Sequence, residues 1–403
     1  MPIITLVSAA YCREEEVARA LAAALSLRIV EDREIIAEAS AKYSIKENKF
    51  YQALFGKPSV FNVFTRDRER CVSCYKAVLA ARLLEDDQLI LGLGGYLVPR
   101  TVTHVLQVSL TADTAFRMDR ARQVHDLEPK ALSKLLDQED ASVTRWTEYL
   151  NWKNPTQTSP SDILISMDNM SVENAVELIQ DRARRSVTLP TVESMQAVEE
   201  FVLIARIEAA LAVKGHVLKV EIKSGKIVLR VDKNIVRPER LEEELLEIVR
   251  DIVPDREVEV QLGSDMFQTD VYRPYDFENP SKVLVVDDEM DFAARLSERL
   301  KMREMGVAVV TSGEEALELV EEDEPEVVIL DLKMPEISGE EVLRMIQKGH
   351  PKIPVIILSG MGDPAKFQAC MDMGAFACLQ KPADFKELTE TIRRAYASLE
   401  QQT

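Results

Sequence analysis

At 403 residues, the chain is long enough for two to four domains of roughly 100–200 residues each. Hydrophobic residues make up 46% and charged residues 30%, an ordinary globular composition that excludes a wholly disordered protein. The net charge is −19, and because an acidic surface repels phosphate backbones, we expect no direct binding of nucleic acid. No apolar run approaches the roughly 20 residues that span a bilayer, so we expect no membrane insertion.

The five cysteines are sparse and odd in number, which is typical of a reducing compartment. The stretch from Met1 to Cys12 begins with apolar residues but carries no basic leader, so we predict no secretory signal and a cytoplasmic location. Cys71 and Cys74 are three residues apart on a predicted helix. Because no further Cys or His lies near them, we expect core packing and not a zinc site.

Residues 1–186 alternate apolar strands with helical stretches, a pattern that predicts an α/β domain with a mainly parallel sheet. The predicted strands are Ile3–Val7, Gln88–Leu91, His104–Leu110 and Asp162–Ser166. Glu15–Leu25 and Val172–Arg184 have helical spacing of their apolar residues. Val187–Thr191, which contains a proline, is predicted to connect this domain to the next.

A small second domain is predicted at residues 195–262, with the order helix, strand, strand, helix, strand. Gly215 ends the first helix, a turn at Ser224-Gly225 joins two strands, and Pro238 opens the second helix. The predicted elements are Val198–Val213, Val217–Ile222, Ile227–Val231, Glu239–Ile252 and Glu257–Leu262. Residues 263–281, rich in aromatic residues and proline, are predicted to be a linker packed against a neighbour.

Residues 282–403 contain five apolar runs separated by helical segments, which predicts five buried parallel strands in a flavodoxin-like (βα)5 domain. The predicted strands are Val283–Val286, Val307–Val310, Val327–Leu330, Val355–Leu358 and Phe376–Gln380. The whole chain is therefore expected to be a multidomain α/β protein.

Chemically active residues follow four of these runs, namely Asp287 and Asp288, Asp331, Ser359, and Lys381. Because ligands of open α/β sheets bind outside the carboxyl ends of the strands, we expect these side chains to converge at one rim. Clustered carboxylates repel one another unless a cation lies among them, and hard oxygen ligands select Mg²⁺. Such a metal would neutralise charge when an anionic phosphodonor meets an anionic nucleophile, while Lys381 and Ser359 contact the phosphoryl oxygens.

The residues at this rim lie within motifs that resemble the response-regulator receiver family. The matching segments are Val283–Glu289, Asp331–Gly339, Ser359-Gly360 and Lys381-Pro382. The resemblance implies that a partner histidine kinase or phosphotransfer protein phosphorylates Asp331. It also makes a homodimer an expectation, because receiver-mediated dimers are common in that family.

The same resemblance implies a role for each residue. Asp288, Asp331 and the backbone carbonyl of Lys333 would bind Mg²⁺ directly, and Asp287 would act through water. Ser359 would move towards the phosphate as the switch.

One position departs from the family. The residue three positions before the lysine is usually aromatic, but here it is Cys378, which we expect to be a small core residue. The departure weakens the expectation of coupling through a rotating Tyr or Phe, but not the expectation of phosphorylation. A receiver fold kept as an unphosphorylated scaffold is the alternative.

The N-terminal residues have the layout of a strand, a phosphate loop and a helix, with Ile4–Ser8 followed by a turn and Glu16–Leu21. Further segments follow in order: Asp32–Ile36, Leu91–Tyr96, Arg117–Arg120, and Asp137–Asp140 with Trp152. This series resembles the cytidylate-kinase-like family of P-loop nucleotide kinases, which implies a P-loop-kinase-like fold for residues 1–186.

The loop Ser8–Glu14, however, contains neither glycine nor lysine. A phosphate cradle needs glycines so that backbone N–H groups can converge on the ligand, and Tyr11 obstructs that approach. Glu14, Glu15 and Glu16 place negative charge where phosphate would bind. We therefore predict a pseudokinase with no cofactor-binding residues.

Two further features of this domain can be explained without a nucleotide-binding site. Arg117, Arg120 and Arg122 are either remnants of a lid or a solvated basic helix face, and we favour the solvated face. Gly92, Gly94 and Gly95 follow a predicted strand, so a tight turn explains them as well as a nucleotide site does.

The element order of residues 195–262 resembles the BON domain, which implies an interaction or spacer module. We interpret the chain as a signalling protein that takes a phosphoryl group on Asp331 and passes the signal through its kinase-like and BON-like domains or to an unknown output protein. Its own chemistry would be limited to aspartyl phosphorylation. One alternative is a nucleotide kinase, cytidylate-like, gated by the receiver; another is a purely structural adaptor.

Overall fold

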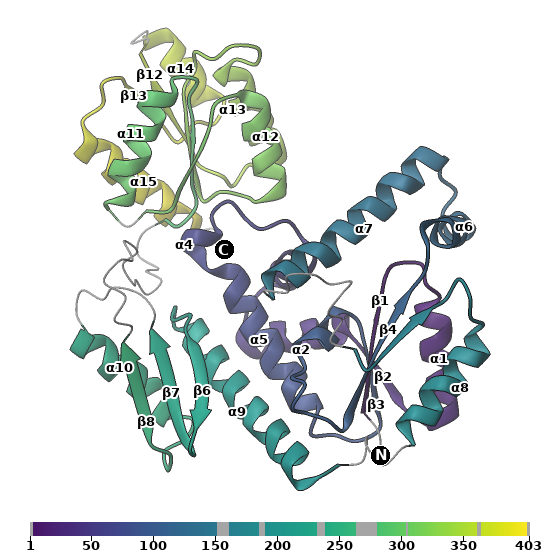
Figure 1. Ribbon diagram of the computed structural model, residues 1–403. Helices are drawn as coiled ribbons and strands as arrows, with labels where there is room; N and C mark the ends of the chain where they lie inside the picture. The colour runs from purple at the N-terminus through teal and green to yellow at the C-terminus, as the bar shows by residue number, and fades with distance from the viewer. Residues whose placement is uncertain are drawn as a thin grey trace. The chain divides into compact units, whose positions relative to one another are not determined.

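The computed structural model describes residues 3–150, 161–184, 190–231, 238–262, 280–303, 305–360 and 364–400. Trp152 and most of the predicted connector 187–191 and linker 263–281 lie outside these residues. The chain divides into two compact units, which we describe separately (Figure 1). The first comprises Met1–Pro58 and Asp67–Arg273, and the second comprises Ser59–Arg66 and Pro274–Thr403.

A five-stranded sheet organises the first unit, with the strand order β2-β3-β1-β4-β5 and parallel pairing throughout. Its strands are β1 (Ile3–Ser8), β2 (Arg28–Glu31), β3 (Gln88–Leu91), β4 (Val105–Thr111) and β5 (Ile163–Ser166). Successive residues of β1 enter two different cores, Ile3 and Val7 one core, Ile4 and Leu6 the other. The sheet is therefore covered on both faces, in agreement with the largely apolar residues of β1.

Helices cover both faces of this sheet. They are α1 (Glu14–Leu25), α2 (Asp32–Tyr43), α3 (Glu47–Phe55), α5 (Asp67–Arg82), the 3-10 helix η1 (Leu93–Leu97), α6 (Thr114–Val124), α7 (Pro129–Tyr149) and α8 (Val172–Ala183). The side chains of α1 and α8 pack in one core, and those of α2, α3 and α5 in the other. Ser171 caps α8 by accepting a hydrogen bond from the Asn174 N–H.

The predicted small domain has the expected order of elements. It consists of α9 (Val192–Val213), β6 (Lys219–Lys223), β7 (Lys226–Val231), α10 (Pro238–Arg250) and β8 (Val258–Leu262). Strand β7 is antiparallel to β6 and parallel to β8, so the sheet is mixed. The hairpin between β6 and β7 turns at Ser224 and Gly225, both of which have positive φ.

Helix α9 is apolar on more than one face. Phe201 and Ala205 belong to the core beside the five-stranded sheet, whereas Ile207 and Leu211 belong to the core of the three-stranded sheet. A helix that is apolar nearly all round is buried on several sides. The predicted boundary at residue 195 therefore lies inside a helix that serves both cores.

The second unit contains the predicted flavodoxin-like domain, with the parallel strand order β10-β9-β11-β12-β13. Its strands are β9 (Val283–Val286), β10 (Val307–Val310), β11 (Val327–Leu330), β12 (Val355–Ser359) and β13 (Ala377–Gln380). Its helices are α11 (Met290–Lys301), α12 (Gly313–Glu322), α13 (Gly339–Gly349), α14 (Pro364–Asp372) and α15 (Phe385–Glu400), together with the short α4 (Asn62–Thr65) from earlier in the chain.

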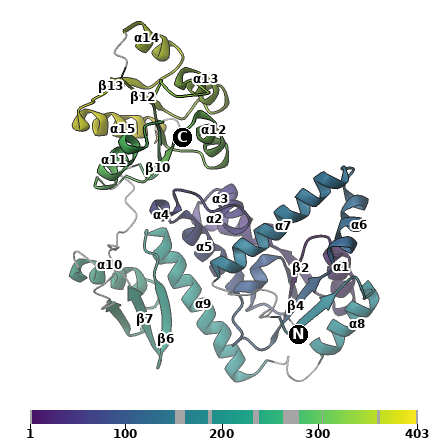
Figure 2. The ribbon, with the colours of Figure 1, turned by 45° about the horizontal axis from the view of Figure 1, so that its top comes forward.

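The flavodoxin-like sheet is also covered on both faces. Helices α12 and α13 lie on one face of the sheet, and α11 and α15 on the other (Figure 2). Leu284 and Val286 pack with residues of α12 and α13, and Val283 and Val285 pack with residues of α11 and α15. The predicted fold class, a multidomain α/β chain, is confirmed: it contains two parallel five-stranded sheets and a small mixed three-stranded sheet. Among the described residues, no helix is long and apolar enough to cross a membrane.

Candidate functional site

The predicted rim exists at the carboxyl ends of the second unit's strands. Asp287 follows β9, Asp331 follows β11, Ser359 ends β12, and Lys381 follows β13. Val286 is paired with Leu330 across β9 and β11, and the Asp331 N–H donates to the Val286 carbonyl at 2.9 Å. The parallel register thus brings residues far apart in the sequence to one edge of the sheet.

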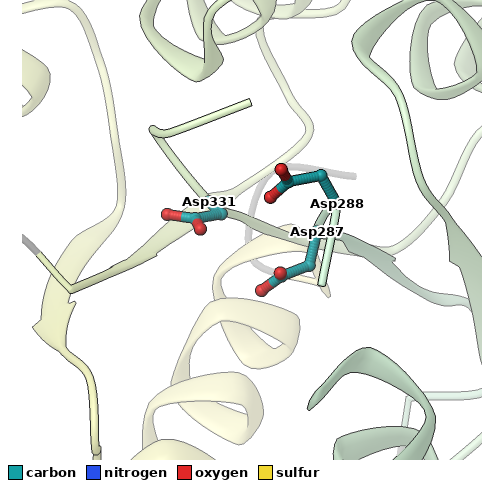
Figure 3. Close-up of side chains that lie close together, drawn as sticks. All are labelled: Asp287, Asp288 and Asp331. Carbon is teal, nitrogen blue, oxygen red and sulfur yellow. The ribbon is translucent and has the colours of Figure 1, made fainter. Parts of the chain in front are cut away.

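Three carboxylates meet at this rim (Figure 3). Oxygen atoms of Asp287, Asp288 and Asp331 lie within 4.8 Å of one another. Asp287 and Asp331 are buried, with exposed fractions of 2% and 4%, whereas Asp288 is exposed. Like charges this close repel one another, and an all-oxygen donor set fits a hard divalent cation such as Mg²⁺. The acidic pocket is therefore consistent with a magnesium site.

Lys381 supplies positive charge to this cluster. Its Nζ donates to Asp287 Oδ2 at 2.6 Å and to Asp331 Oδ2 at 2.9 Å, and it lies 4.4 Å from the ring centre of Phe292. Burial alone would lower the pKa of Lys381, but the two carboxylates outweigh burial and the pKa is raised. The ammonium group therefore stays charged and bridges the two buried carboxylates.

Asp287 has a raised pKa. Its burial raises the pKa, and the nearby charge of Asp331 adds to that effect. The Lys381 hydrogen bond and the Glu289 N–H, which donates to Asp287 Oδ1 at 3.0 Å, oppose the shift without cancelling it. Three carboxylates therefore share one ammonium group, which only partly offsets their charge.

The loop after Asp331 depends on a close backbone approach. The Lys333 N–H donates to Asp331 Oδ1 at 3.3 Å, which orients the carboxylate. A Cβ on Gly339 would lie 2.1 Å from the Asp331 backbone oxygen, so α13 can begin here only with glycine. Gly339 belongs to the motif noted in the sequence, but the reason for the glycine is visible only in three dimensions.

The other predicted residues lie at or beside the same rim. Ser359 is buried, and its backbone oxygen accepts a hydrogen bond from the Lys381 N–H at 2.9 Å. Cys378 is half-buried in β13, its Sγ donates to the Phe367 carbonyl at 3.6 Å, and burial raises its pKa to about 11. These features agree with a packing role for Cys378. Phe292, which lies against Lys381, was not singled out from the sequence, because its apolar spacing on α11 predicts only core packing.

The loop Ser8–Glu14 of the first unit and the adjoining α1 contact the helices α6 and α7. The Arg117 Nε donates to the Ala10 carbonyl at 2.8 Å, and its guanidinium forms two hydrogen bonds to Asp140, at 3.0 and 2.6 Å. Arg120 pairs with Glu16, and the Tyr11 hydroxyl lies 2.8 Å from His125 Nε2.

The expectation of a solvated basic face on α6 is wrong for Arg117, whose side chain is only 8% exposed. The bidentate pair with Asp140 and the hydrogen bond to the Ala10 carbonyl keep the Arg117 side chain buried.

The backbone of the loop Ser8–Glu14 is also unusual, because Tyr11 and Arg13 have φ values of 66° and 63°. Glycine normally supplies this left-handed conformation.

Packing explains the glycines after β3. The buried Asp32 carboxylate accepts hydrogen bonds from the Tyr75 hydroxyl at 2.5 Å and from the Leu93 and Gly94 N–H groups at 2.8 and 3.3 Å. A Cβ on Gly92 would lie 2.2 Å from Asp32 Oδ2, and a Cβ on Gly94 would lie 2.1 Å from the Tyr75 hydroxyl. Close packing against Asp32 and Tyr75 therefore accounts for these two glycines, and a nucleotide site is not needed to explain them.

Comparison with known families gives two separate matches. Residues 283–393 match the response regulator receiver domain, and residues 3–169 match the cytidylate kinase-like family. The chain carries a receiver domain at its C-terminal end and a cytidylate kinase-like domain at its N-terminal end.

Individual relatives match only part of the chain. The probable transcriptional regulator ycf27 of Guillardia theta is 40% identical over 118 residues, 29% of this chain and 46% of that protein. The response regulator MprA of Mycolicibacterium vanbaalenii is 32% identical over 114 residues, 28% of this chain and 49% of that protein. A solved receiver domain protein of Clostridium thermocellum is 35% identical, covers 30% of this chain and 98% of its own, and has a TM-score of 0.30. The chain spans about half the length of the curated relatives that it matches.

Gly339→Ala is expected to destabilise the receiver by about 1–3 kcal/mol, because the added methyl group overpacks against the Asp331 backbone. Urea unfolding monitored by circular dichroism measures the change. Gly349→Ala, at the other end of the same helix, is the matched control, because its nearest neighbouring atom is 3.9 Å away. Equal stability of the two variants would contradict the explanation.

Asp287→Asn is expected to stabilise the metal-free receiver at neutral pH, raising Tm by about 2–4 °C. Because the folded state holds the pKa of Asp287 above its ordinary value, folding is favoured by protonation and disfavoured by ionisation of this carboxyl. The gain should shrink as the pH falls from the folded-state pKa towards the ordinary value, where the wild-type carboxyl is protonated as well. Thermal scans across this range measure it.

Glu298→Gln, at an exposed position of α11, is the control for loss of one acidic charge. It should leave both Tm and its pH dependence nearly unchanged. A gain for Asp287→Asn that grows on acidification would argue against the assigned cause.

Proposed function

We propose that this protein is a response regulator of a two-component pathway and that Asp331 accepts the phosphoryl group from a partner histidine kinase or phosphotransfer protein. The observation that carries this proposal is the rim itself, where three carboxylates lie within 4.8 Å of one another and Lys381 bridges two of them. A purely structural sheet edge has no need of buried like charges.

In this reaction an oxygen of Asp331 attacks the phosphorus of the donor. The new O–P bond forms as the bond from phosphorus to the donor's nitrogen or oxygen breaks, and the leaving group takes the electron pair. Asp288, Asp331 and the Lys333 carbonyl would hold Mg²⁺, with Asp287 acting through water, and the bound ion would neutralise charge between nucleophile and donor. Lys381 would transfer part of its hydrogen bonding from Asp331 to the phosphoryl oxygens, and the Ser359 hydroxyl would donate to the phosphoryl group as the switch.

The cytidylate kinase-like domain would act as a pseudokinase, with the signal leaving through protein contacts. Its loop has neither glycine nor lysine, and Arg117 and Arg120, which could contact phosphate, are already paired with Asp140 and Glu16. Pairing with a carboxylate offsets the guanidinium charge and occupies part of its N–H donors, which weakens its attraction for phosphate. The three-stranded module would serve as a BON-like interaction or spacer element, in a cytoplasmic protein that forms a homodimer.

A receiver-gated nucleotide kinase is the second candidate, and one observation favours it. Tyr11 and Arg13 keep the left-handed backbone that glycines give to phosphate loops, so part of the loop's shape is present. Under the pseudokinase proposal, calorimetric titration with ATP or CMP should show no saturable binding. Saturable binding that Arg117→Ala weakens would favour the kinase.

Incubation of the full chain with Mg²⁺ and acetyl phosphate should add one phosphoryl group, detected by intact mass. Asp331→Asn should abolish the gain because it removes the nucleophile. Asp291→Asn, an exposed aspartate on α11, is the matched control and should leave the gain unchanged. Labelling that persists in Asp331→Asn, or no labelling of the wild type, would refute the proposal.

A further inference from the structure

A short stretch inside the cytidylate kinase-like match belongs structurally to the receiver. The match covers residues 3–169, yet Ser59–Arg66 clusters with residues 274–403 and not with the residues on either side of it. The stretch contains α4, a single turn of four residues from Asn62 to Thr65. The chain therefore leaves the first unit after Pro58 and returns to it at Asp67.

Phe61 anchors this stretch. Its side chain is fully buried, and it belongs to the same core as Leu284 and Val328, residues of the central strands β9 and β11. The Phe61 N–H donates to Ser59 Oγ at 3.0 Å, and Lys282 Nζ lies 5.8 Å from the centre of the Phe61 ring. A fully buried aromatic side chain that is in contact with a cation contributes strongly to docking.

Polar contacts surround this anchor. Ser59 Oγ donates a hydrogen bond to Asp323, and Lys282 pairs with the same carboxylate. Asp323 is only 7% exposed, so the contact is largely shielded from water. Lys301 Nζ lies 5.6 Å from the centre of the Phe64 ring. An aromatic centre with a polar surround is the usual anatomy of a specific protein interface.

Only one side of the stretch takes part. Phe61 and Thr65 are buried, with exposed fractions of 0% and 4%, whereas Val60 and Val63 are 54% and 72% exposed. Phe61 and Phe64 are three residues apart, so they lie on one face of the helical turn, and both lie beside lysines of the receiver. Apolar collapse without specificity would not leave two valines exposed beside the buried phenylalanine.

The docking surface lies at the amino-terminal ends of the strands. Lys282 immediately precedes β9, and Glu326 precedes β11; the Lys282 N–H donates to Glu326 at 3.1 Å, which ties the two strand starts together. The same two strands end at Asp287 and Asp331. The docked stretch therefore leaves the phosphorylation rim free, while both strands that carry the acidic cluster begin at its surface.

We propose that Ser59–Arg66 is an intramolecular docking segment, anchored by Phe61, through which the receiver acts on the first unit. The docking rests on the contacts above, whereas the signal that it transmits rests on the proposed phosphorylation of Asp331. Because coupling between two sites is reciprocal, phosphorylation that alters docking implies that docking alters phosphorylation.

A disulfide cross-link tests the docking in the full chain. Ser59→Cys with Asp323→Cys places two thiols where the hydroxyl and carboxylate now contact each other, so mild oxidation should give a near-complete intramolecular disulfide. Val63→Cys with Asp323→Cys is the matched control, because Val63 is exposed on the same turn and should give little cross-link. Absence of the first cross-link, or equal yields from both pairs, would overturn the proposal.

Hydrogen–deuterium exchange tests whether phosphorylation of Asp331 affects the docking segment. After treatment with Mg²⁺ and acetyl phosphate, exchange in residues 59–66 should change by about threefold or more, and Asp331→Asn should show no change. The mass of the same sample records whether phosphate was accepted. Phosphorylation with unchanged exchange would overturn the coupling, whereas a missing phosphate would contradict the proposed function and leave docking to be decided by the cross-link.

A core variant gives a further check on the anchor. Phe61→Ala should speed exchange at the starts of β9 and β11 by about tenfold or more, because the cavity loosens the core beneath them. Val63→Ala should leave it unchanged, since that side chain is exposed. Unchanged exchange in Phe61→Ala would show that the anchor assignment is wrong.

Discussion

The bridge from Lys381 to Asp287 and Asp331 is the interaction on which the receiver site depends. Two buried carboxylates at the ends of adjacent strands would repel each other, and the ammonium group between them offsets much of this repulsion. The offset is incomplete, because burial keeps the pKa of Asp287 raised even with Lys381 in place. A site with this residual demand for positive charge is suited to a divalent cation and to an anionic reaction that the cation assists.

The corresponding sheet edge of the first unit differs in its charges, because positive and negative side chains there pair with one another. Its loop after β1 also lies at the carboxyl end of a parallel strand, but the arginines of α6 are paired, Arg117 with Asp140 and Arg120 with Glu16. Pairing with a carboxylate weakens the attraction of an arginine for a further anion. This contrast is the reason for the proposal that the receiver carries the phosphoryl chemistry and the kinase-like domain an interaction role.

The modules that the sequence suggests are less separate in the folded chain. Helix α9 contributes Phe201 to the core beside one sheet and Leu211 to the core of the other, so a cut near residue 195 would remove Phe201 from the core beside the five-stranded sheet and expose apolar surface there. Ser59–Arg66 likewise belongs to the receiver although it lies within the kinase-like stretch. Packing, and not sequence similarity, defines the structural units here.

The sequence by itself determined the receiver's strands and its reactive residues. Continuous apolar runs mark buried parallel strands, and parallel topology places whatever follows them at one edge, so Asp287, Asp331 and Lys381 could be predicted to meet. Only the tertiary structure decided that Arg117 is buried, because its partners are 23 and 107 residues away in the sequence. The same holds for Phe61, which packs in a core whose other residues lie more than 200 positions further along the chain. Local patterns report local geometry, whereas a side chain's burial depends on which distant surface the fold brings against it.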